Sequence, residues 1–477
     1  MVENYHPDPV FVRLGDKNGA PFYDPVTAAD FPETILRYRN QRWAERVGLG
    51  DLSEKAWLSH FGRFSPLPDN QSGPVAMRYH GHQFRSYNPD LGDGRGFLFA
   101  QLRDDHGRLL DLGTKGSGQT PYSRAGDGRL TLKGGVREIL ATEMLEALGV
   151  YTSKTFSLIE TGEALMRDDE PSPTRSAVMV RLSHSHIRFG SFQRLAYEEN
   201  YDAVRALVDY CVTHFYPHLS STAGDERIVE FFKAVIANTA KLTAQWMAAG
   251  FVHGVLNTDN MNITGESFDY GPWRFIPTAD PSFTAAYFDR TGLYSFGRQG
   301  EACAWNLAQL GGALSRVTDI DALNEALQTY PPNYEAAMAD AFFARLGLLR
   351  TGDNDFSFVA NFLRWLNETG APYEQVFFDW FCGAASRKRP ERSPIAELYV
   401  QDKFKDLGIA LTSYDPDRPE RLDHEYFAGS PTTMLIDEVE AIWAPIAESD
   451  DWSRLEQKIS AIGSMREAYG FEASSYG

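Results

Sequence analysis

Cysteine is scarce in this chain, and no apolar run is long enough to span a membrane. The three cysteines, Cys211, Cys303 and Cys382, are widely spaced and form no Cys-x-x-Cys pair, which argues against a disulfide framework or a zinc site. The first residues lack both an apolar signal core and an Arg-rich amphipathic pattern. We therefore expect a cytoplasmic protein.

Positive charge is also in deficit. Lysine and arginine number 46 against 65 aspartate and glutamate residues, giving a net charge of −19. This balance argues against broad binding to nucleic acid or to an anionic membrane, but it is compatible with a local basic pocket. With 477 residues, 43% of them hydrophobic and 23% charged, the chain has an ordinary globular composition and enough length for two or three domains.

Four segments follow one another along the chain. Residues 1–75 form an extension that we expect to pack on the core, residues 76–190 are strand-like with one helix, and residues 191–394 are mostly helical. Residues 395–477 form a C-terminal helical extension, expected to pack against the helical segment. A small β-rich lobe followed by a larger helical lobe is the plan of the protein kinases. We therefore predict an α+β, protein-kinase-like two-lobe fold with extensions at both ends.

Periodicity and turn residues predict the individual elements. A hairpin is expected from residues 97–102 and 109–113, and a further strand over residues 176–182. Helices are predicted around residues 32–46, 51–61, 135–148, 202–219, 227–249, 303–317, 320–328, 334–346, 433–447 and 452–469.

The run from His253 to Asn260 carries the strongest chemical signal. Asp259 stands beside Asn260, and Asp269 follows nine positions later, after the strand-like run 261–268. A hard cation clamped to a triphosphate uses an Asn or carboxylate from one loop and a carboxylate from the next, with a third carboxylate free to take a proton. His253 is expected to orient this loop rather than to react.

Lys115 ends a predicted strand and would ordinarily be a solvated edge residue. Glu138, off the apolar stripe of the helix 135–148, gives it a partner. A strand Lys held by a helix Glu orients an ammonium group onto phosphates in kinase-like folds. We expect this pair to form.

Two glycine-rich runs could bring backbone amides close to phosphates. The first, residues 91–96, contains Gly92, Gly94 and Arg95 and lacks the features of a dinucleotide or Walker loop. The second, residues 126–129, contains Asp127 and Gly128. Either run could instead be a simple tight turn.

Arg181 and Arg188 lie seven residues apart at the exit of a strand, where two planar forks could converge on one phosphate. The alternative is a pair of surface ion bridges. The concentration of Arg95, Lys115, Arg181 and Arg188 around one candidate pocket of an acidic protein favours phosphate. The pair His80 and His82 could ligate zinc, but no barrel rhythm accompanies it, which favours structural histidines.

In their order, these motifs resemble the selenoprotein O family, whose members were long labelled pseudokinases. The resemblance rests on LGDGRG at 91–96, Lys115, GDGR at 126–129, VREIL with Glu138, RLSHSHIRFG at 181–190, HGVLNTDN at 253–260 and FDYGP at 268–272. It is colinear from about residue 75 to 315 and weakens beyond. Each motif alone is modest, whereas the ordered set is highly specific.

The resemblance implies protein AMPylation: ATP, inverted in a kinase-like cleft, gives AMP to Ser, Thr or Tyr hydroxyls of target proteins. UMP transfer from UTP is also associated with the family. By the same resemblance, Asp259 is the proton acceptor and Asn260 and Asp269 bind Mg²⁺ or Mn²⁺. The residues expected to hold the nucleotide are Gly92, Gly94, Arg95, Lys115, Asp127, Gly128, Arg181, Arg188 and Asp269, with Glu138 orienting Lys115. A monomer in the bacterial cytoplasm is expected, with ATP or UTP and protein substrates as its partners.

Two departures from the family pattern stand out. Members often carry a Cys after the DYG segment and another near the C-terminus, linked to redox control, but residues 280–287 and 471–477 contain none. We therefore expect no disulfide switch. The C-terminal extension matches the family only loosely, so its role stays open.

Three alternatives to adenylyl transfer remain at this point. They are an ordinary phosphotransferase, a non-catalytic nucleotide-binding scaffold and, more distantly, a zinc hydrolase. The intact set of Asp259, Asn260 and Asp269 argues against the scaffold, because a protein without catalysis has no need of a metal clamp.

Overall fold

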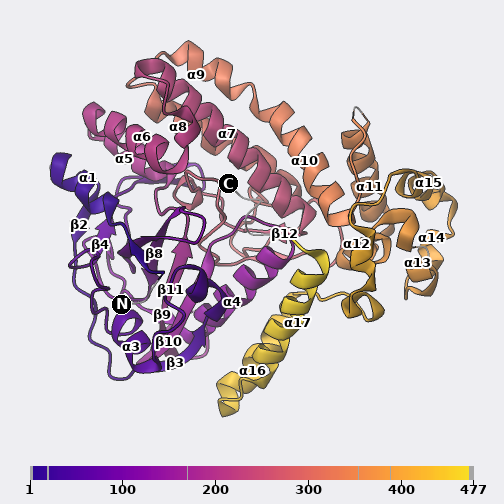
Figure 1. Ribbon diagram of the computed structural model, residues 1–477, viewed down its shortest axis with the longest axis horizontal. Helices are drawn as coiled ribbons and strands as arrows, with labels where there is room; N and C mark the ends of the chain where they lie inside the picture. The colour runs from indigo at the N-terminus through magenta and orange to yellow at the C-terminus, as the bar shows by residue number, and fades with distance from the viewer. Residues whose placement is uncertain (1–3, 19–20, 169, 353, 387, 472–477) are drawn as a thin grey trace.

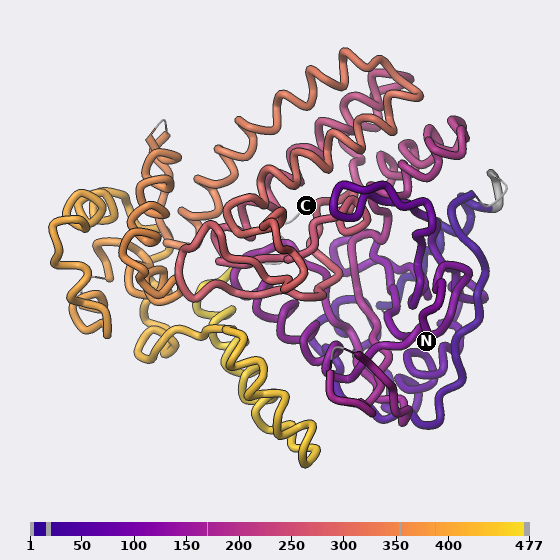
Figure 2. Tube along the Cα trace, turned by 180° about the vertical axis from the view of Figure 1, so that it is seen from behind, coloured from indigo at the N-terminus to yellow at the C-terminus, as the bar shows by residue number. Residues whose placement is uncertain are grey.

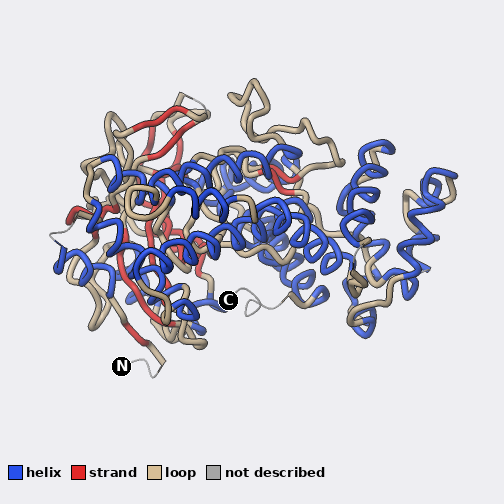
Figure 3. Tube along the Cα trace, turned by 90° about the horizontal axis from the view of Figure 1, so that it is seen from above, coloured by secondary structure: helices blue, strands red, loops and turns tan. Residues whose placement is uncertain are grey.

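A computed structural model describes all residues except 1–3, 19–20, 169, 353, 387 and 472–477. Strands gather at one end of the molecule and helices fill the rest (Figure 3). The main sheet has nine strands in the order β2-β4-β7-β8-β11-β10-β3, with β1 paired to β7 and β9 paired to β11. The strands of this sheet are β1 His6–Pro7, β2 Tyr23–Pro25, β3 Ile35–Arg39, β4 Val75–Met77, β7 Leu98–Arg103, β8 Leu109–Lys115, β9 Leu130–Thr131, β10 Lys154–Leu165 and β11 Thr174–Ser183.

The central strands confirm the predicted hairpin and the predicted strand after it. β7 and β8 pair antiparallel with Leu102 opposite Leu110, and β11 pairs with the other edge of β8. Side chains of β8 alternate between two apolar clusters: Leu109 belongs to the large cluster that also holds Phe11 and Tyr210, and Leu110 belongs to the cluster that holds Trp43 and Trp57 of the N-terminal segment. Burial on both faces fixes the strand register and thereby the position of Lys115 at its end.

The N-terminal segment covers one face of the sheet. Its helices α2 Gln41–Arg46 and α3 Glu54–Phe61 lie on this face, whereas α1 Val10–Asn18 packs against the helix Tyr201–Phe215. Trp57 and Phe61 on α3 pack against Phe156 of β10. The helix predicted over 51–61 is thus confirmed.

The helix predicted over residues 32–46 is wrong in its first half. Ile35–Arg39 is strand β3, which pairs with β10, and the helix begins only at Gln41. Asn40 marks the change because its side chain accepts a hydrogen bond from Trp43 N and caps α2. Pairing with a long neighbouring strand outweighs the helical periodicity of this stretch.

Helix α4 (Leu132–Ala147) crosses the other face of the sheet (Figure 1). The Thr131 side chain caps it by accepting from Gly134 N, and Gly149, with φ of 80°, lies just beyond its end. Along its length α4 buries Glu138, Glu143 and Glu146. Buried carboxylates require cationic or hydrogen-bonding partners, and α4 therefore depends on the groups around it.

The remaining chain is largely helical, and the predicted helices between residues 202 and 346 are confirmed. The long α7 packs against α8 and α10. The helices of this part are α5 Phe189–Tyr197, α6 Tyr201–Phe215, α7 Gly224–Ala248, α8 Gln299–Leu314, α9 Ile320–Leu327, α10 Tyr330–Leu346, α11 Asp355–Thr369 and α12 Tyr373–Trp380. Among the described residues, no helix combines the length and apolarity needed to cross a bilayer.

The strand-like run 261–268 does not form a strand. It makes isolated bridges instead, Asn262 with Arg188 and Ser267 with Thr152. Gly265, with φ of 73°, turns the chain between them, which prevents a continuous extended segment.

The C-terminal extension runs back toward the sheet-bearing half of the molecule (Figures 1 and 2). It contains α14 Ala396–Tyr399, α15 Lys405–Ser413, α16 Ile436–Ser449 and α17 Ser453–Tyr469, and the short α13 Lys388–Arg392 precedes it. The prediction that its final helices pack on the helical segment is incomplete, because α16 and α17 both lie against α4. Arg466 explains this placement: it forms ion pairs with Glu143 and Glu146, two of the buried carboxylates of α4.

Candidate active site

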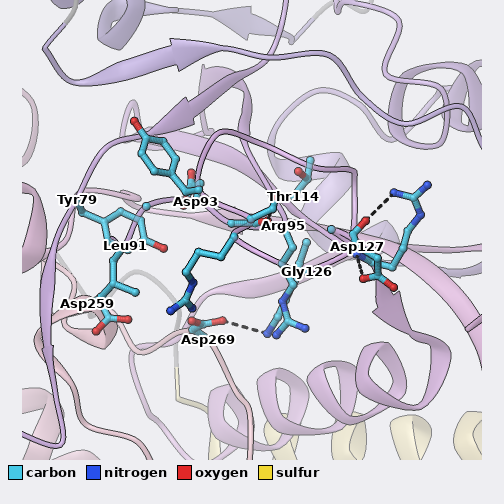
Figure 4. Close-up of a pocket in the computed structure, with 18 of the residues that line it drawn as sticks. Tyr79, Leu91, Asp93, Arg95, Thr114, Gly126, Asp127, Asp259 and Asp269 are labelled. Atoms are coloured by element: carbon cyan, nitrogen blue, oxygen red, sulfur yellow. Dashed lines mark hydrogen bonds and ion pairs between the residues drawn. The ribbon is translucent and has the colours of Figure 1, made fainter. Parts of the chain in front are cut away.

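A cleft with a volume of about 660 Å³ lies between the sheet, two glycine-rich loops and the loop that carries Asp259 and Asp269. Figure 4 shows Asp259 and Asp269 along one wall and Asp127 at the opposite end from Asp259. Ten residues expected from the sequence line it: Gly92, Gly94, Arg95, Lys115, Asp127, Gly128, Arg181, Arg188, Asp259 and Asp269. Asn260 and Glu138 stand behind this lining, each hydrogen-bonded to one of its members.

Lys115, Glu138 and Asp269 form a charge cluster at the inner wall, in which Lys115 and Glu138 are buried and Asp269 is partly exposed. Lys115 Nζ donates to Glu138 Oε1 and lies 3.0 Å from Asp269 Oδ1. Lys115 and Glu138 are only 5% and 1% exposed. A desolvated ammonium between two carboxylates is fixed in position, so its direction toward the cleft is set before any ligand binds.

Asp269 attracts two further cations. Arg181 Nη1 lies 3.6 Å from its Oδ1, and Arg188 Nη1 lies 3.7 Å from its Oδ2. Burial opposes ionisation of Asp269, but Lys115, Arg181 and Arg188 together outweigh it and hold the pKa of this carboxyl well below its usual value. Asp269, a quarter of whose side chain is exposed, is therefore an anion at neutral pH.

The two arginines retain unused hydrogen-bonding capacity. Within the described part of the chain, Arg181 Nε and Nη1 and Arg188 Nε are buried and have no hydrogen-bond acceptor. The Arg188 guanidinium lies over the rings of Tyr79 and Phe268, at 4.5 and 4.8 Å from their centroids. Buried N–H groups without acceptors are costly, and a bound phosphate group would supply the missing oxygens.

Asp259 lies in a short 3₁₀ turn, η2 (Thr258–Asn260), and is 8% exposed. Its Oδ1 is buried without a hydrogen-bond partner among the described residues. Burial raises the pKa of Asp259 to about 6, and the nearby Arg188 partly opposes that shift. A carboxylate with a pKa close to neutral and a free oxygen is suited to accept a proton from a hydroxyl group.

Asn260 and Asp269 together offer oxygen ligands for a hard cation. Asn260 Nδ2 donates to Asp269 Oδ2 at 3.1 Å, and Asn260 Oδ1 is buried without a donor among the described residues. Amide and carboxylate oxygens are the ligand types that Mg²⁺ and Mn²⁺ accept. Within the described part of the chain, no group of three or more His, Cys, Asp or Glu residues could hold a metal by itself. The donor set therefore fits a cation whose remaining ligands come from phosphate oxygens and water.

The histidines of the region are engaged in hydrogen bonds. His80 Nδ1 lies 2.8 Å from Tyr87 Oη, and His82 Nδ1 lies 2.8 Å from Gln193 Nε2. His253 Nε2 lies 2.9 Å from Phe268 O, which ties together the two ends of residues 253–268, the segment called the catalytic loop below. Burial lowers the pKa of His80 to about 4, so it is neutral at physiological pH.

The glycines have a packing role that the sequence did not indicate. A Cβ atom at Gly92 would lie 2.3 Å from the Tyr122 ring, and one at Gly128 would lie 2.2 Å from Gly118 O. Gly92 lets the first loop lie close against Tyr122 of the segment that leads into the second, and Gly128 lets the second loop close on that segment at Gly118. Asp127 accepts from Arg129 N and pairs with Arg167, with half of its side chain exposed.

Asp93 is a site residue that sequence reasoning missed. Its Oδ2 accepts from Met77 N at 3.0 Å, and its Oδ1 lies 3.6 Å from Arg188 Nη2. Burial raises its pKa, against the attraction of Arg188. The one feature of the sequence that could have indicated Asp93 is its position between Gly92 and Gly94.

Comparison with known proteins points to a single family. The sequence profile described as "Protein adenylyltransferase SelO" matches residues 8–463. A protein of Gloeobacter violaceus named "Protein nucleotidyltransferase YdiU" is 46% identical over 97% of this chain and 95% of its own length. Proteins of the same name from Synechocystis and from Pseudomonas entomophila are 43% and 36% identical, over 96% and 82% of this chain and 98% and 80% of their own lengths.

Proposed function

The chain belongs to the SelO family of protein adenylyltransferases, and we propose that its cleft transfers AMP from ATP to Ser, Thr or Tyr hydroxyls of protein substrates. This assignment rests on two sets of groups that lie in the same cavity. Buried cations with unsatisfied N–H groups line one side, and a carboxylate with a raised pKa and a free oxygen lies nearby.

The cations set the orientation of the nucleotide. Lys115, Arg181 and Arg188 are 4–5% exposed, whereas Arg95 and Asp127 lie at the open side. The terminal phosphates therefore bind inside, where the dielectric is low and each N–H···O contact is strong. The base then points toward the loop of Asp127 and Gly128, which is inverted relative to a kinase. In this orientation the α-phosphate is the one nearest the acceptor.

The chemical step is a displacement at the α-phosphorus. Asp259 takes the proton from the acceptor hydroxyl, and the freed oxygen forms a bond to the α-phosphorus. The bond from that phosphorus to the bridging α,β oxygen breaks, and pyrophosphate leaves. Lys115, Arg181 and Arg188 hold the leaving group and stabilise the charge that develops on it.

Asn260 and Asp269 would hold Mg²⁺ or Mn²⁺, which would add charge stabilisation on the phosphate oxygens. Glu138 keeps Lys115 in place. The hydrogen bond from Arg188 to the Asp259 carbonyl fixes the catalytic loop relative to the phosphate site. We also propose that residues 76–190 and 191–394 are the two lobes of a kinase-like fold, with 1–75 and 395–477 as extensions.

Labelled ATP tests this function against a conventional kinase. With purified protein, Mn²⁺ and a protein acceptor, label in the α-phosphate should become covalently attached, and label in the γ-phosphate should appear in pyrophosphate. Covalent γ-label would establish phosphoryl transfer and overturn the proposal. Competition between ATP and UTP in the same assay determines the preferred donor.

A further inference from the structure

Three exposed aromatic side chains form a continuous row beside the catalytic loop. Phe84, Tyr287 and Phe288 are 39%, 85% and 45% exposed. The Phe288 ring centroid lies 5.9 Å from that of Phe84 and 5.1 Å from that of Tyr287. We call these three residues the aromatic row. Large apolar side chains that stay together in water mark contact surfaces.

The row is joined directly to the residues that precede Asp259. Phe84 N donates to Asn257 Oδ1 at 3.1 Å, and Tyr294 Oη donates to the same oxygen at 2.8 Å. The rings of Phe84 and Tyr294 lie 5.1 Å apart. Gln83, next in the chain to Phe84, lines the nucleotide cleft. The aromatic row therefore begins at the edge of the cleft, next to the proposed proton acceptor.

The backbone that presents Phe84 is strained. Strands β5 (Gly81–Gln83) and β6 (Ser86–Asn88) form a hairpin whose two turn residues, Phe84 and Arg85, have φ of 49° and 64°. Two-residue hairpin turns of this kind normally use Asn or Gly, because other residues are unfavourable there. Arg85 anchors the turn by an ion pair with Glu301, at 2.8 Å, and by the contact of its guanidinium with the face of the Trp305 ring. A strained turn that exposes an aromatic ring points to a function in binding.

We propose that the aromatic row docks an apolar side chain of the protein substrate, close in sequence to the hydroxyl that receives AMP. This inference rests on the proposed function, since the acceptor hydroxyl must approach Asp259 while the nucleotide fills the inner cleft. Ring faces bury an apolar side chain without desolvating a charge, and their rigidity keeps the entropic cost low. The row thus selects acceptor sites with a neighbouring apolar residue.

Synthetic peptides test this docking role. Each peptide carries one Tyr, Ser or Thr acceptor in a Gly- and Ser-rich background, with Leu, Glu or Lys placed at successive flanking positions. Transfer from α-labelled ATP should favour Leu over Glu about tenfold at one or two positions. The double variant Tyr287→Ser/Phe288→Ser, and separately Phe84→Ser, should lose this preference through a raised KM for the peptide.

The matched control is Val400→Ser/Ile409→Ser, which removes two exposed apolar side chains, 85% and 60% exposed, from the C-terminal extension. It should retain the preference, and the KM for ATP should be unchanged in the control and in the Tyr287/Phe288 variant.

Equal labelling of all peptides by the wild type, or a preference that survives in both row variants, overturns the docking role while leaving AMP transfer established. A wild-type dimer that the Tyr287/Phe288 variant dissociates would assign the row to self-association instead. Failure to transfer α-label to any peptide or protein would overturn the proposed function and the docking role together.

Discussion

Arg188 Nη1 donates to the backbone carbonyl of Asp259 at 2.7 Å. The same guanidinium lies within 3.7 Å of Asp269 and 3.6 Å of Asp93. One side chain therefore connects the proposed phosphate site, the proposed proton acceptor and the first glycine-rich loop. We therefore expect binding of the phosphates and positioning of the catalytic loop to be coupled through Arg188.

Arg188→Lys should lower kcat/KM for AMP transfer by about 100-fold. Lysine keeps the charge but cannot reach Asp259 O, Asp93 and Asp269 together, nor stack on Tyr79 and Phe268. Steady-state kinetics with α-labelled ATP measures the effect. Arg205→Lys, at an exposed pair with Asp225, serves as the control. Near wild-type activity of Arg188→Lys would show that charge alone suffices.

Glu138→Gln should lower kcat/KM by about 100-fold while the protein stays folded. The variant leaves Lys115 paired only with Asp269, and the ammonium shifts away from the phosphate site. Glu143→Gln is the matched control, because Glu143 is buried on the same helix but pairs with Arg466 rather than with Lys115. Calorimetric titration with a non-hydrolysable ATP analogue should show weaker binding for Glu138→Gln only. Equal losses of activity in both variants would mean that Glu138 matters only for the stability of α4 and not for the position of Lys115.

Arg466→Met should lower the free energy of unfolding by about 1–2 kcal/mol. The change removes one hydrogen-bonded cation from Glu143 and Glu146, which keep other partners in Tyr38, Asn40 and Arg42. Urea unfolding measures the difference. Lys458→Met, which breaks a partly exposed pair with Glu438, should cost less than about 1 kcal/mol. If both substitutions cost the same, α17 is not held to α4 by these charges.

Glu266 should make stability depend on pH near neutrality. Burial raises its pKa to about 7, against the attraction of Lys154. A folded-state pKa above the unfolded value of 4.5 means that the stabilisation is complete below pH 4.5 and is lost as the pH rises through 7. The shift corresponds to about 3 kcal/mol at most. Glu266→Gln cannot ionise, so its free energy of unfolding relative to the wild type should improve between pH 5 and pH 8. A constant difference over this range would contradict the assignment.

Dithiothreitol should leave AMP transfer by this protein unchanged. Cys211, Cys303 and Cys382 are buried and unpaired in the described structure. The expectation also depends on the absence of cysteine from residues 472–477, which lie outside the described residues. Transfer assays with and without the reductant, and mass mapping under non-reducing conditions, test it. Activation that accompanies loss of an intramolecular disulfide would show that a switch exists after all.

Most charged residues of the cleft could be predicted from the sequence because they lie in short motifs whose order along the chain is specific. Lys115 and Glu138 follow from a strand and a helix that were both recognisable, and the structure joins them. The role of the glycines was less accessible, since contact with Tyr122 depends on how two distant loops meet. Asp93 was not predicted because its contacts, with Met77 N and Arg188, are also to residues distant in the sequence.

Elements set by tertiary contact were the hardest to predict. Ile35–Arg39 has no strong strand pattern of its own and becomes β3 through pairing with β10. The docking of α17 on α4 follows from Glu143 and Glu146, whose burial could not be inferred before the path of α4 was known. Local periodicity therefore predicted most helices but not which surfaces they cover.

The proposed nucleotide orientation and metal site are tested most directly by a structure of the protein with Mn²⁺ and an ATP analogue that cannot be cleaved between the α- and β-phosphates. We predict that the β- and γ-phosphates lie against Lys115, Arg181 and Arg188, that the base lies near Gly128, and that an anomalous Mn²⁺ peak appears beside Asn260 and Asp269. A purine seated among the arginines, or a metal ion remote from Asn260 and Asp269, would contradict it.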